Sequence, residues 1–308
     1  MKYIQLLLYI LLLLLWGCSG NNSSSEETPN GKLYIVSTTG MIHDIVSNIG
    51  GSYVEAVSLM GPGVDPHLYK ATRTDLQELR KADAIFYNGL HLEGKMGEIL
   101  EKLSKQKPTF PIGEAIPKNR LHSPPDQPNA IDPHVWFDVS LWIKASEYVA
   151  AKLTEIDSTH ATEYAQALEK YSKELSDLHV WTQLEINHIP EESRVLITAH
   201  DAFGYFGKAY GIEVRGLQGI STMSEFGLKD VAELVDFIVE RKIKAVFVES
   251  SIPTKSLEAV QAGCKQKNHL VQIGGSLYSD AMGEAGTDEG TYIGMVKANV
   301  TTIVKALQ

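Results

Sequence analysis

Short apolar runs alternate with amphipathic stretches along most of the chain. In the first half, runs at Leu33–Ser37, Tyr53–Leu59 and Ala84–Tyr87 predict buried strands, and the stretches Met41–Ile49 and Thr72–Lys81 predict helices. The second half repeats this pattern, with predicted strands at Arg194–Thr198, Val214–Leu217, Ala245–Glu249 and Leu270–Ile273 and predicted helices at Ala202–Tyr210, Leu228–Arg241, Ser256–Lys267 and Thr291–Leu307. Alternating strands and helices predict an α/β fold in which each half has a parallel sheet flanked by helices.

A long helix is predicted between the two halves. No Gly or Pro occurs from His160 to Ile189, and Pro190 follows. Apolar residues recur there at steps of four and three, at Tyr164, Leu168, Tyr171, Leu175 and Leu178. A helix of about 28 residues would be roughly 42 Å long, enough to connect two lobes as a rigid strut. The same pattern is also compatible with a coiled-coil arm.

The N-terminus has the pattern of an export signal. The run from Ile4 to Leu15 is apolar except for Gln5, and about 12 apolar residues are fewer than the roughly 20 of a membrane-spanning helix. The run ends in Leu15-Trp16-Gly17-Cys18, which resembles the lipobox of bacterial lipoproteins, although Trp16 departs from the small or β-branched residue usual there. We therefore expect a signal peptide at residues 1–17, lipid on Cys18 and a flexible polar tether at residues 18–31. The alternative is an uncleaved anchor helix, and either leaves the body outside the cytoplasm.

Composition and charge exclude several classes of protein. The 308 residues are 44% apolar and 21% charged, which suits one or two globular domains. The 28 basic and 38 acidic residues give a net charge of -10, which argues against nucleic acid as a partner. With only two cysteines, and Cys18 assigned to lipid, Cys264 has no partner for a disulfide and is expected to be a packed residue. A thiolate zinc cluster is excluded for the same reason.

Three of the ten histidines stand out by their context. His67 and His134 each follow Asp-Pro, and the proline stiffens the loop that presents the imidazole. His200 follows a predicted strand at its carboxyl end, the edge where open α/β sheets bind ligands. A packed ring or a helix cap remains the alternative for each of them. A fourth ligand from the last loop would be Asp280, Glu284, Asp288 or Glu289, and their spacing does not choose among them.

Five blocks in order resemble one known family. They are Met60-Gly61-Pro62-Gly63-Val64-Asp65-Pro66-His67, Asp132-Pro133-His134-Val135-Trp136, Thr198-Ala199-His200-Asp201-Ala202-Phe203-Gly204-Tyr205-Phe206, Phe247-Val248-Glu249-Ser250-Ser251 and Leu277-Tyr278-Ser279-Asp280-Ala281-Met282-Gly283. With the lipobox, they resemble the metal-binding lipoproteins of bacterial zinc, manganese and iron ABC importers, and most closely the subgroup that binds zinc or manganese through three His and one Asp. The resemblance implies the metal ligands His67, His134, His200 and Asp280.

The resemblance also implies an organisation and a role. It places an N-terminal lobe at residues 32–159, a rigid linker helix at 160–189 and a C-terminal lobe at 190–308. It implies a monomer, anchored to the membrane by its lipid, that captures a divalent ion between the lobes and delivers it to a cognate ABC permease.

Zinc is the favoured ion, because imidazole suits zinc and the family's manganese specialists usually have Glu at the place of His200. Manganese is the close alternative, since the segment His122–Asn129 lacks the long His-rich loop of zinc specialists, and iron is a further one. Asp65, Asp132 and Asp201, or backbone carbonyls, are expected to orient the imidazoles.

Two other functions remain open at this point. A zinc-dependent hydrolase would need a base such as Glu249, although a structural role at the end of a strand suits that residue better. The chain lacks the His-Glu-x-x-His and Gly-x-Ser-x-Gly motifs, and four protein ligands leave no position for catalytic water, so we do not expect an enzyme. A surface adhesin or interaction lipoprotein with incidental metal binding is the other alternative.

Overall fold

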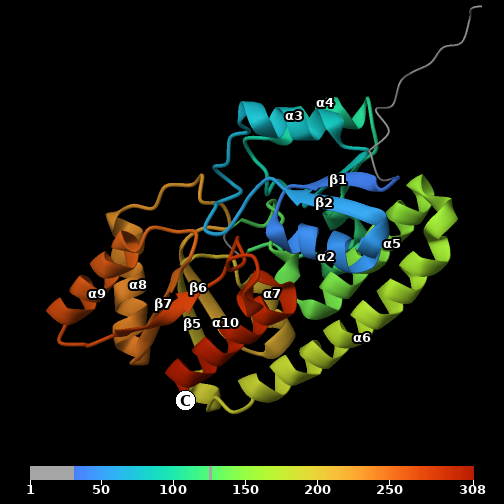
Figure 1. Cartoon of the computed structure of the whole chain (residues 1–308). Coiled ribbons are helices and arrows are strands. Elements are labelled where there is room, and N and C mark those ends of the chain that lie inside the picture. The colour runs from blue at the N-terminus through green and yellow to red at the C-terminus, as the bar shows by residue number, and fades with distance from the viewer. Residues whose placement is uncertain (1–30, 125–126) are drawn as a thin grey trace, which may run out of the picture. The chain divides into compact units, whose positions relative to one another are not determined.

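The computed structural model describes residues 31–124 and 127–308 (Figure 1). The expected signal peptide at residues 1–17, the expected lipidation site Cys18 and the expected tether as far as residue 30 lie outside the described residues. No helix in the described ranges is both long and apolar enough to cross a bilayer.

Eight strands form two four-stranded parallel sheets. The first contains β1 (Leu33–Ser37), β2 (Val54–Ser58), β3 (Ala84–Tyr87) and β4 (Thr109–Pro111) in the order β2-β1-β3-β4. The second repeats this order as β6-β5-β7-β8, with strands β5 (Val195–His200), β6 (Glu213–Gln218), β7 (Ala245–Glu249) and β8 (Gln272–Leu277). All the strand pairs are parallel, so the carboxyl ends of neighbouring strands share one edge of each sheet.

Helices follow the strands as the sequence pattern predicts. Their bounds are α2 (Gly40–Gly50), α3 (Arg73–Lys81), α4 (Gly97–Ser104), α5 (Val139–Ile156), α6 (Ala161–Ile186), α7 (Gly204–Tyr210), α8 (Leu228–Arg241), α9 (Lys255–Gln266) and α10 (Tyr292–Leu307). Helix α3 begins with a capping box, in which Thr72 accepts from the backbone N–H of Asp75 and Asp75 accepts from that of Thr72. The predicted fold class, two parallel sheets flanked by helices and joined by a long helix, is confirmed.

Some elements differ from the prediction. Helices α4 and α5 and the short strand β4 were not expected. Strand β8 lies further along the chain than predicted, because Leu270 stays outside the sheet and is 77% exposed. Strand β5 extends to His200, so this histidine is the last residue of the strand and not the residue after it.

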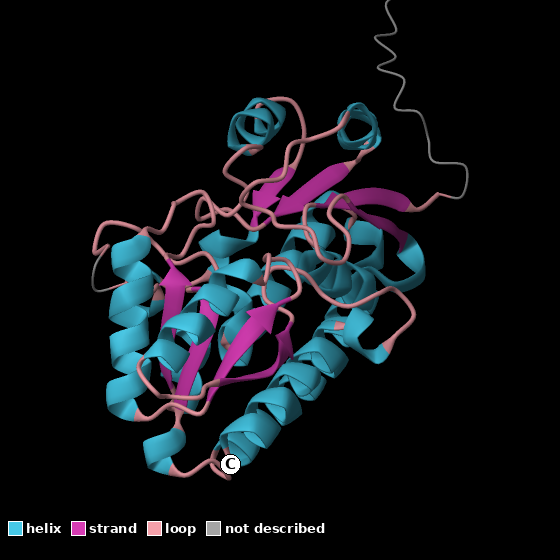
Figure 2. Ribbon diagram, turned by 90° about the vertical axis from the view of Figure 1, so that its left-hand side faces the viewer, coloured by secondary structure: helices cyan, strands magenta, loops and turns pink. Residues whose placement is uncertain are grey.

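The two sheets share one central layer of helices (Figures 1 and 2). Along β1, Ile35 packs into a core with α2, α5, α6 and α10, while Val36 points to the other face, which α3 and α4 cover. Along β5, Leu196 joins that same central core, while Ile197 packs on the opposite face against α8 and α9. Because successive side chains of a strand point to opposite faces, the outer face of each sheet packs in a separate hydrophobic core. The inner faces of both sheets pack against one common core.

Helix α6 runs along both halves of this central layer. It is 26 residues long and contacts α2 and α5 of the first half and α7 and α10 of the second. Its buried side chains include Tyr164, Tyr171, Leu175 and Leu178, which are four of the five positions of the predicted apolar stripe. The helix thus packs against both halves as a strut and does not project as a coiled-coil arm.

Candidate metal site

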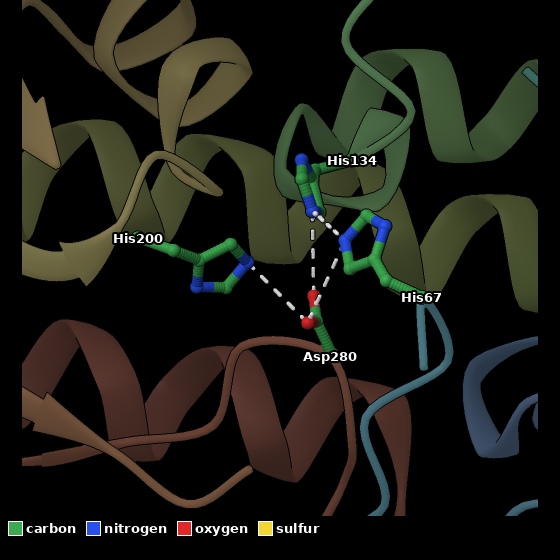
Figure 3. Close-up of side chains that lie close together, drawn as sticks. All are labelled: His67, His134, His200 and Asp280. Carbon is green, nitrogen blue, oxygen red and sulfur yellow. Dashed lines mark hydrogen bonds and ion pairs between the residues drawn. The ribbon is translucent and has the colours of Figure 1, made fainter. Parts of the chain in front are cut away.

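Four side chains from four separate segments converge between the two sheets (Figure 3). His67 comes from the loop between β2 and α3, and His134 comes from the loop that leads into a 3-10 turn at Val135–Phe137. His200 ends β5, and Asp280 follows β8. Each half of the chain therefore contributes two of the four. All four are buried, with at most 2% of any residue exposed.

The spacing of their polar atoms fits one small ion. All four ligand atoms lie within 4.8 Å of one another. His67 Nε2 lies 3.3 Å from His134 Nε2, His134 Nε2 lies 3.4 Å from Asp280 Oδ1, and His200 Nε2 lies 3.3 Å from Asp280 Oδ2. Donor atoms about 2.0–2.1 Å from a tetrahedral ion are about 3.3–3.4 Å apart, so three contacts match that geometry. The fourth, between His67 Nε2 and Asp280 Oδ2, is 3.9 Å.

Buried carboxylates orient two of the three imidazoles. Asp132 Oδ1 lies 2.7 Å from His134 Nδ1, and Glu249 Oε2 lies 2.6 Å from His200 Nδ1. These contacts leave each Nε2 facing the centre of the site. The backbone N–H groups of His134 and His200 also donate to Asp132 and Glu249. Carboxylates in this position fix ring orientation and raise the basicity of a metal-binding imidazole.

The expected partners of the imidazoles are only partly correct. Asp132 supports the ring of His134 as predicted. Asp65 accepts from the backbone N–H of His67 and not from its ring. The ring of His200 pairs with Glu249 and not with Asp201. The sequence suggests Glu249 only as the base of a hydrolase or as a structural residue at the end of a strand. The only sequence signal for Glu249 is its place at the carboxyl end of a predicted strand, and the structure adds that this strand lies beside the strand of His200.

Burial and the charges within the site shift the pKa values of its members. Burial lowers the pKa of His67 to about 3, despite the opposing charge of Asp280. Burial also disfavours the charged form of His134, but Asp132 and Asp280 outweigh it and raise that pKa to about 9. For His200, burial is likewise outweighed by Glu249 and Asp280, which raise its pKa well above the usual value. Against the effect of its own burial, Asp280 has a pKa held well below its usual range by His200 and His134.

The other candidates lie outside this cluster. Glu284 and Asp288 are exposed, and Glu289 is half-buried. Within the described ranges, the cluster of potential metal ligands contains none of the other histidines, which are His43, His91, His122, His160, His179, His188 and His269. Cys264 is buried, as the sequence predicts, and forms no disulfide within the part of the chain that the structure describes.

The fold and the cluster define a class, the two-lobed α/β metal-binding proteins. The family described as "ZnuA: Zinc-uptake complex component A periplasmic" matches residues 35–306. The manganese-binding lipoprotein MntA of Bacillus subtilis is 51% identical over 292 residues, which cover 95% of this chain and 94% of that protein. The zinc-binding protein TroA of Treponema pallidum is 48% identical over 284 residues, 92% of each chain. A solved structure of the Treponema pallidum protein superposes with a TM-score of 0.87 at 49% identity, covering 90% of this chain and 99% of that one.

The chain belongs to this zinc-uptake component A family. It is therefore an extracytoplasmic lipoprotein that serves as the metal-binding, substrate-binding component of an ABC transporter. As a solute-binding protein it is not an enzyme, and Glu249, the candidate base of the hydrolase alternative, is engaged with His200.

Proposed function

We propose that the protein captures Zn²⁺ between its two lobes, with His67, His134, His200 and Asp280 as the four ligands, and delivers it to an ABC permease. The observation that carries this proposal is the convergence of three imidazole Nε2 atoms and the carboxylate of Asp280, with three separations of 3.3–3.4 Å that involve both oxygens of that carboxylate. Those separations suit four donors around a tetrahedral zinc ion. The donor set, three imidazoles and one carboxylate, also favours zinc over ions that prefer oxygen ligands.

Manganese is the second candidate, and a specific observation supports it. Oδ1 of Asp280 faces His134 and Oδ2 faces His200, so both oxygens point into the site. A carboxylate that binds through both oxygens would raise the number of donors to five, which suits manganese better than zinc. The names of the relatives divide in the same way, since one is a manganese-binding lipoprotein and the other a zinc-binding protein.

The remaining parts of the proposal concern the chain around the site. We propose lobes at residues 32–159 and 190–308 with a linker helix at 160–189, a signal peptide at 1–17, lipid on Cys18 and a tether at 18–31. The lipid would hold the protein beside its permease, so that the metal is handed over without diffusing away. The partner is one cognate permease, and the protein acts as a monomer.

Replacement of single ligands tests the site. His67→Ala removes one of four donors and is expected to weaken zinc binding by at least a hundredfold, while the circular dichroism spectrum stays unchanged. His188→Ala is the matched control, because its side chain is 60% exposed in the turn that follows α6. Calorimetric titration of zinc into both variants measures the difference. Equal affinities for wild type and His67→Ala would refute the ligand assignment.

The identity of the metal needs a separate measurement. Protein purified without added metal is analysed for its elements, and the stripped protein is then titrated with zinc in the presence of manganese. Zinc as the copurified metal, retained against a hundredfold excess of manganese, supports the first candidate. Manganese as the retained metal would replace it with the second.

A further inference from the structure

Among the described residues, Asp280 and His67 are the two members of the site whose polar side-chain atoms have neither a hydrogen-bond nor an ion-pair partner outside the site. The rings of His134 and His200 each lie against a buried carboxylate. Apart from the imidazoles of the site, no donor in the described residues reaches either oxygen of Asp280. The position of this carboxylate therefore depends on how the main chain that carries it is held.

Asn299 holds that main chain from within the same half of the protein. Its side chain is 2% exposed on α10. Its Oδ1 accepts from the backbone N–H of Tyr278 at 2.8 Å, and its Nδ2 donates to the carbonyl of Tyr278 at 2.7 Å. One amide side chain thus satisfies both polar groups of a residue two positions before Asp280, as a neighbouring strand would.

Trp136 holds the same segment from the other half. Its indole Nε1 donates to the carbonyl of Ser279, the residue before Asp280, at 3.1 Å. Trp136 itself follows His134 by two residues, and its ring lies 5.2 Å from that imidazole. The hydroxyl of Tyr292 in turn donates to the carbonyl of Trp136 at 2.6 Å. These contacts are buried, so each hydrogen bond would leave an unpaired group if one partner were removed.

We propose that Trp136 and Asn299 are positioning residues that set where Asp280 stands relative to His134, and that they thereby set the strength of metal binding. Asn299 fixes the segment within its own lobe, and Trp136 ties the segment to the loop of His134 across the two lobes. This inference rests on the proposed function, because it concerns how Asp280 is held as a ligand.

A pair of tryptophan replacements tests the role of Trp136. Trp136→Phe keeps an aromatic ring but removes the donor to Ser279, and it is expected to weaken zinc binding about tenfold, the effect of one lost buried hydrogen bond. Trp142→Phe is the matched control, because Trp142 is fully buried, stacks on Tyr292 and has an indole N–H without a partner in the described residues. It is expected to bind zinc within twofold of wild type.

A double-mutant cycle separates positioning from general stability. In an Asp280→Asn background, Trp136→Phe is expected to change zinc affinity less than twofold, since the group it positions is already altered. In a His67→Ala background it is expected to keep its tenfold effect. Cobalt(II) is a second probe, because its visible absorption depends on the number and arrangement of its ligands. Trp136→Phe is expected to change that spectrum, and Trp142→Phe to preserve it.

Each outcome decides between named alternatives. An equal loss in the wild-type and Asp280→Asn backgrounds, or no loss in Trp136→Phe, would overturn the inference while the ligand assignment stands. Unchanged affinity in Asp280→Asn itself would overturn the ligand assignment and the inference with it. If Trp136→Phe does not fold, Asn299→Leu removes the two hydrogen bonds to Tyr278 at similar side-chain volume. Its effect on zinc affinity should likewise disappear in the Asp280→Asn background.

Discussion

Metal binding should depend steeply on pH, and the size of this dependence follows from the shifted pKa values of the site. His134 has a pKa raised to about 9 and that of His200 is raised well above its usual value, so both imidazoles carry an extra proton near pH 7 when no metal is bound. The pKa of His67 is lowered to about 3 and that of Asp280 lies well below its usual range, so neither has a proton to lose there. A metal ion needs neutral imidazoles, and its binding must therefore displace about two protons.

The protonation states of the two imidazoles determine the direction and the size of this pH dependence. A raised pKa means that the proton is bound at every pH below that value, so acid competes with metal and affinity rises with pH until the imidazoles are neutral. Each displaced proton contributes one logarithmic unit of affinity per pH unit, so zinc affinity should rise about a hundredfold per unit between pH 6 and pH 8. The steepness should fall as pH passes the pKa of His134 at about 9.

Calorimetry measures the proton count directly. Zinc is titrated at pH 7 in buffers with different heats of ionisation, and the slope of observed heat against ionisation heat gives the protons released per ion. About two protons support the assignment. A value near zero, or an affinity that is constant from pH 7 to pH 8, would show that the carboxylates do not raise these pKa values and would refute the reasoning.

Three further outcomes are expected. Glu249→Gln should weaken zinc binding about 10–100-fold, because it removes the charge that orients the ring of His200, and competition with a zinc chelator measures the loss. Leu178→Ala should lower the free energy of unfolding by about 2–5 kcal/mol in a denaturant titration, because Leu178 is only 2% exposed. The control Leu184→Ala, on the same helix but at a position 58% exposed, should change that free energy by less than about 0.5 kcal/mol. Zinc at 100 times its Kd should stabilise the protein by about 2.7 kcal/mol and raise its melting temperature by about 5 °C, and a chelator should reverse the shift. A melting temperature that zinc leaves unchanged would contradict binding to the folded protein.

The parts of the fold that depend on local pattern could be predicted from the sequence. Alternating strands and helices gave the two sheets, and the apolar stripe from Tyr164 to Leu178 gave α6 because a helix buries residues at steps of three and four. Strand β8 was misplaced, because an exposed edge strand with Gly274 and Gly275 lacks the apolar run that marks a buried one. Helix α5 was not expected, although eight of its eighteen residues are buried.

The site was predictable where the sequence itself constrains a loop. The two Asp-Pro-His segments gave His67 and His134 as candidates, since proline fixes its own φ and restricts the residue before it. Local spacing did not choose Asp280 over Glu284, because that choice depends on which carboxylate the fold buries. The pairing of Glu249 with His200 joins residues 49 positions apart on neighbouring strands, and only the sheet order brings them together.

The central layer of helices packs against both sheets and belongs to neither sheet alone. Ile35 of β1, Leu196 of β5 and Leu175 of α6 are all fully buried in one continuous core. A fragment that contained only one half would expose its side of that core to water, at a cost of about 25 cal/mol for each Å² of apolar surface. We therefore expect that neither half can be produced as a stable folded fragment, and that the intact body melts in a single cooperative transition.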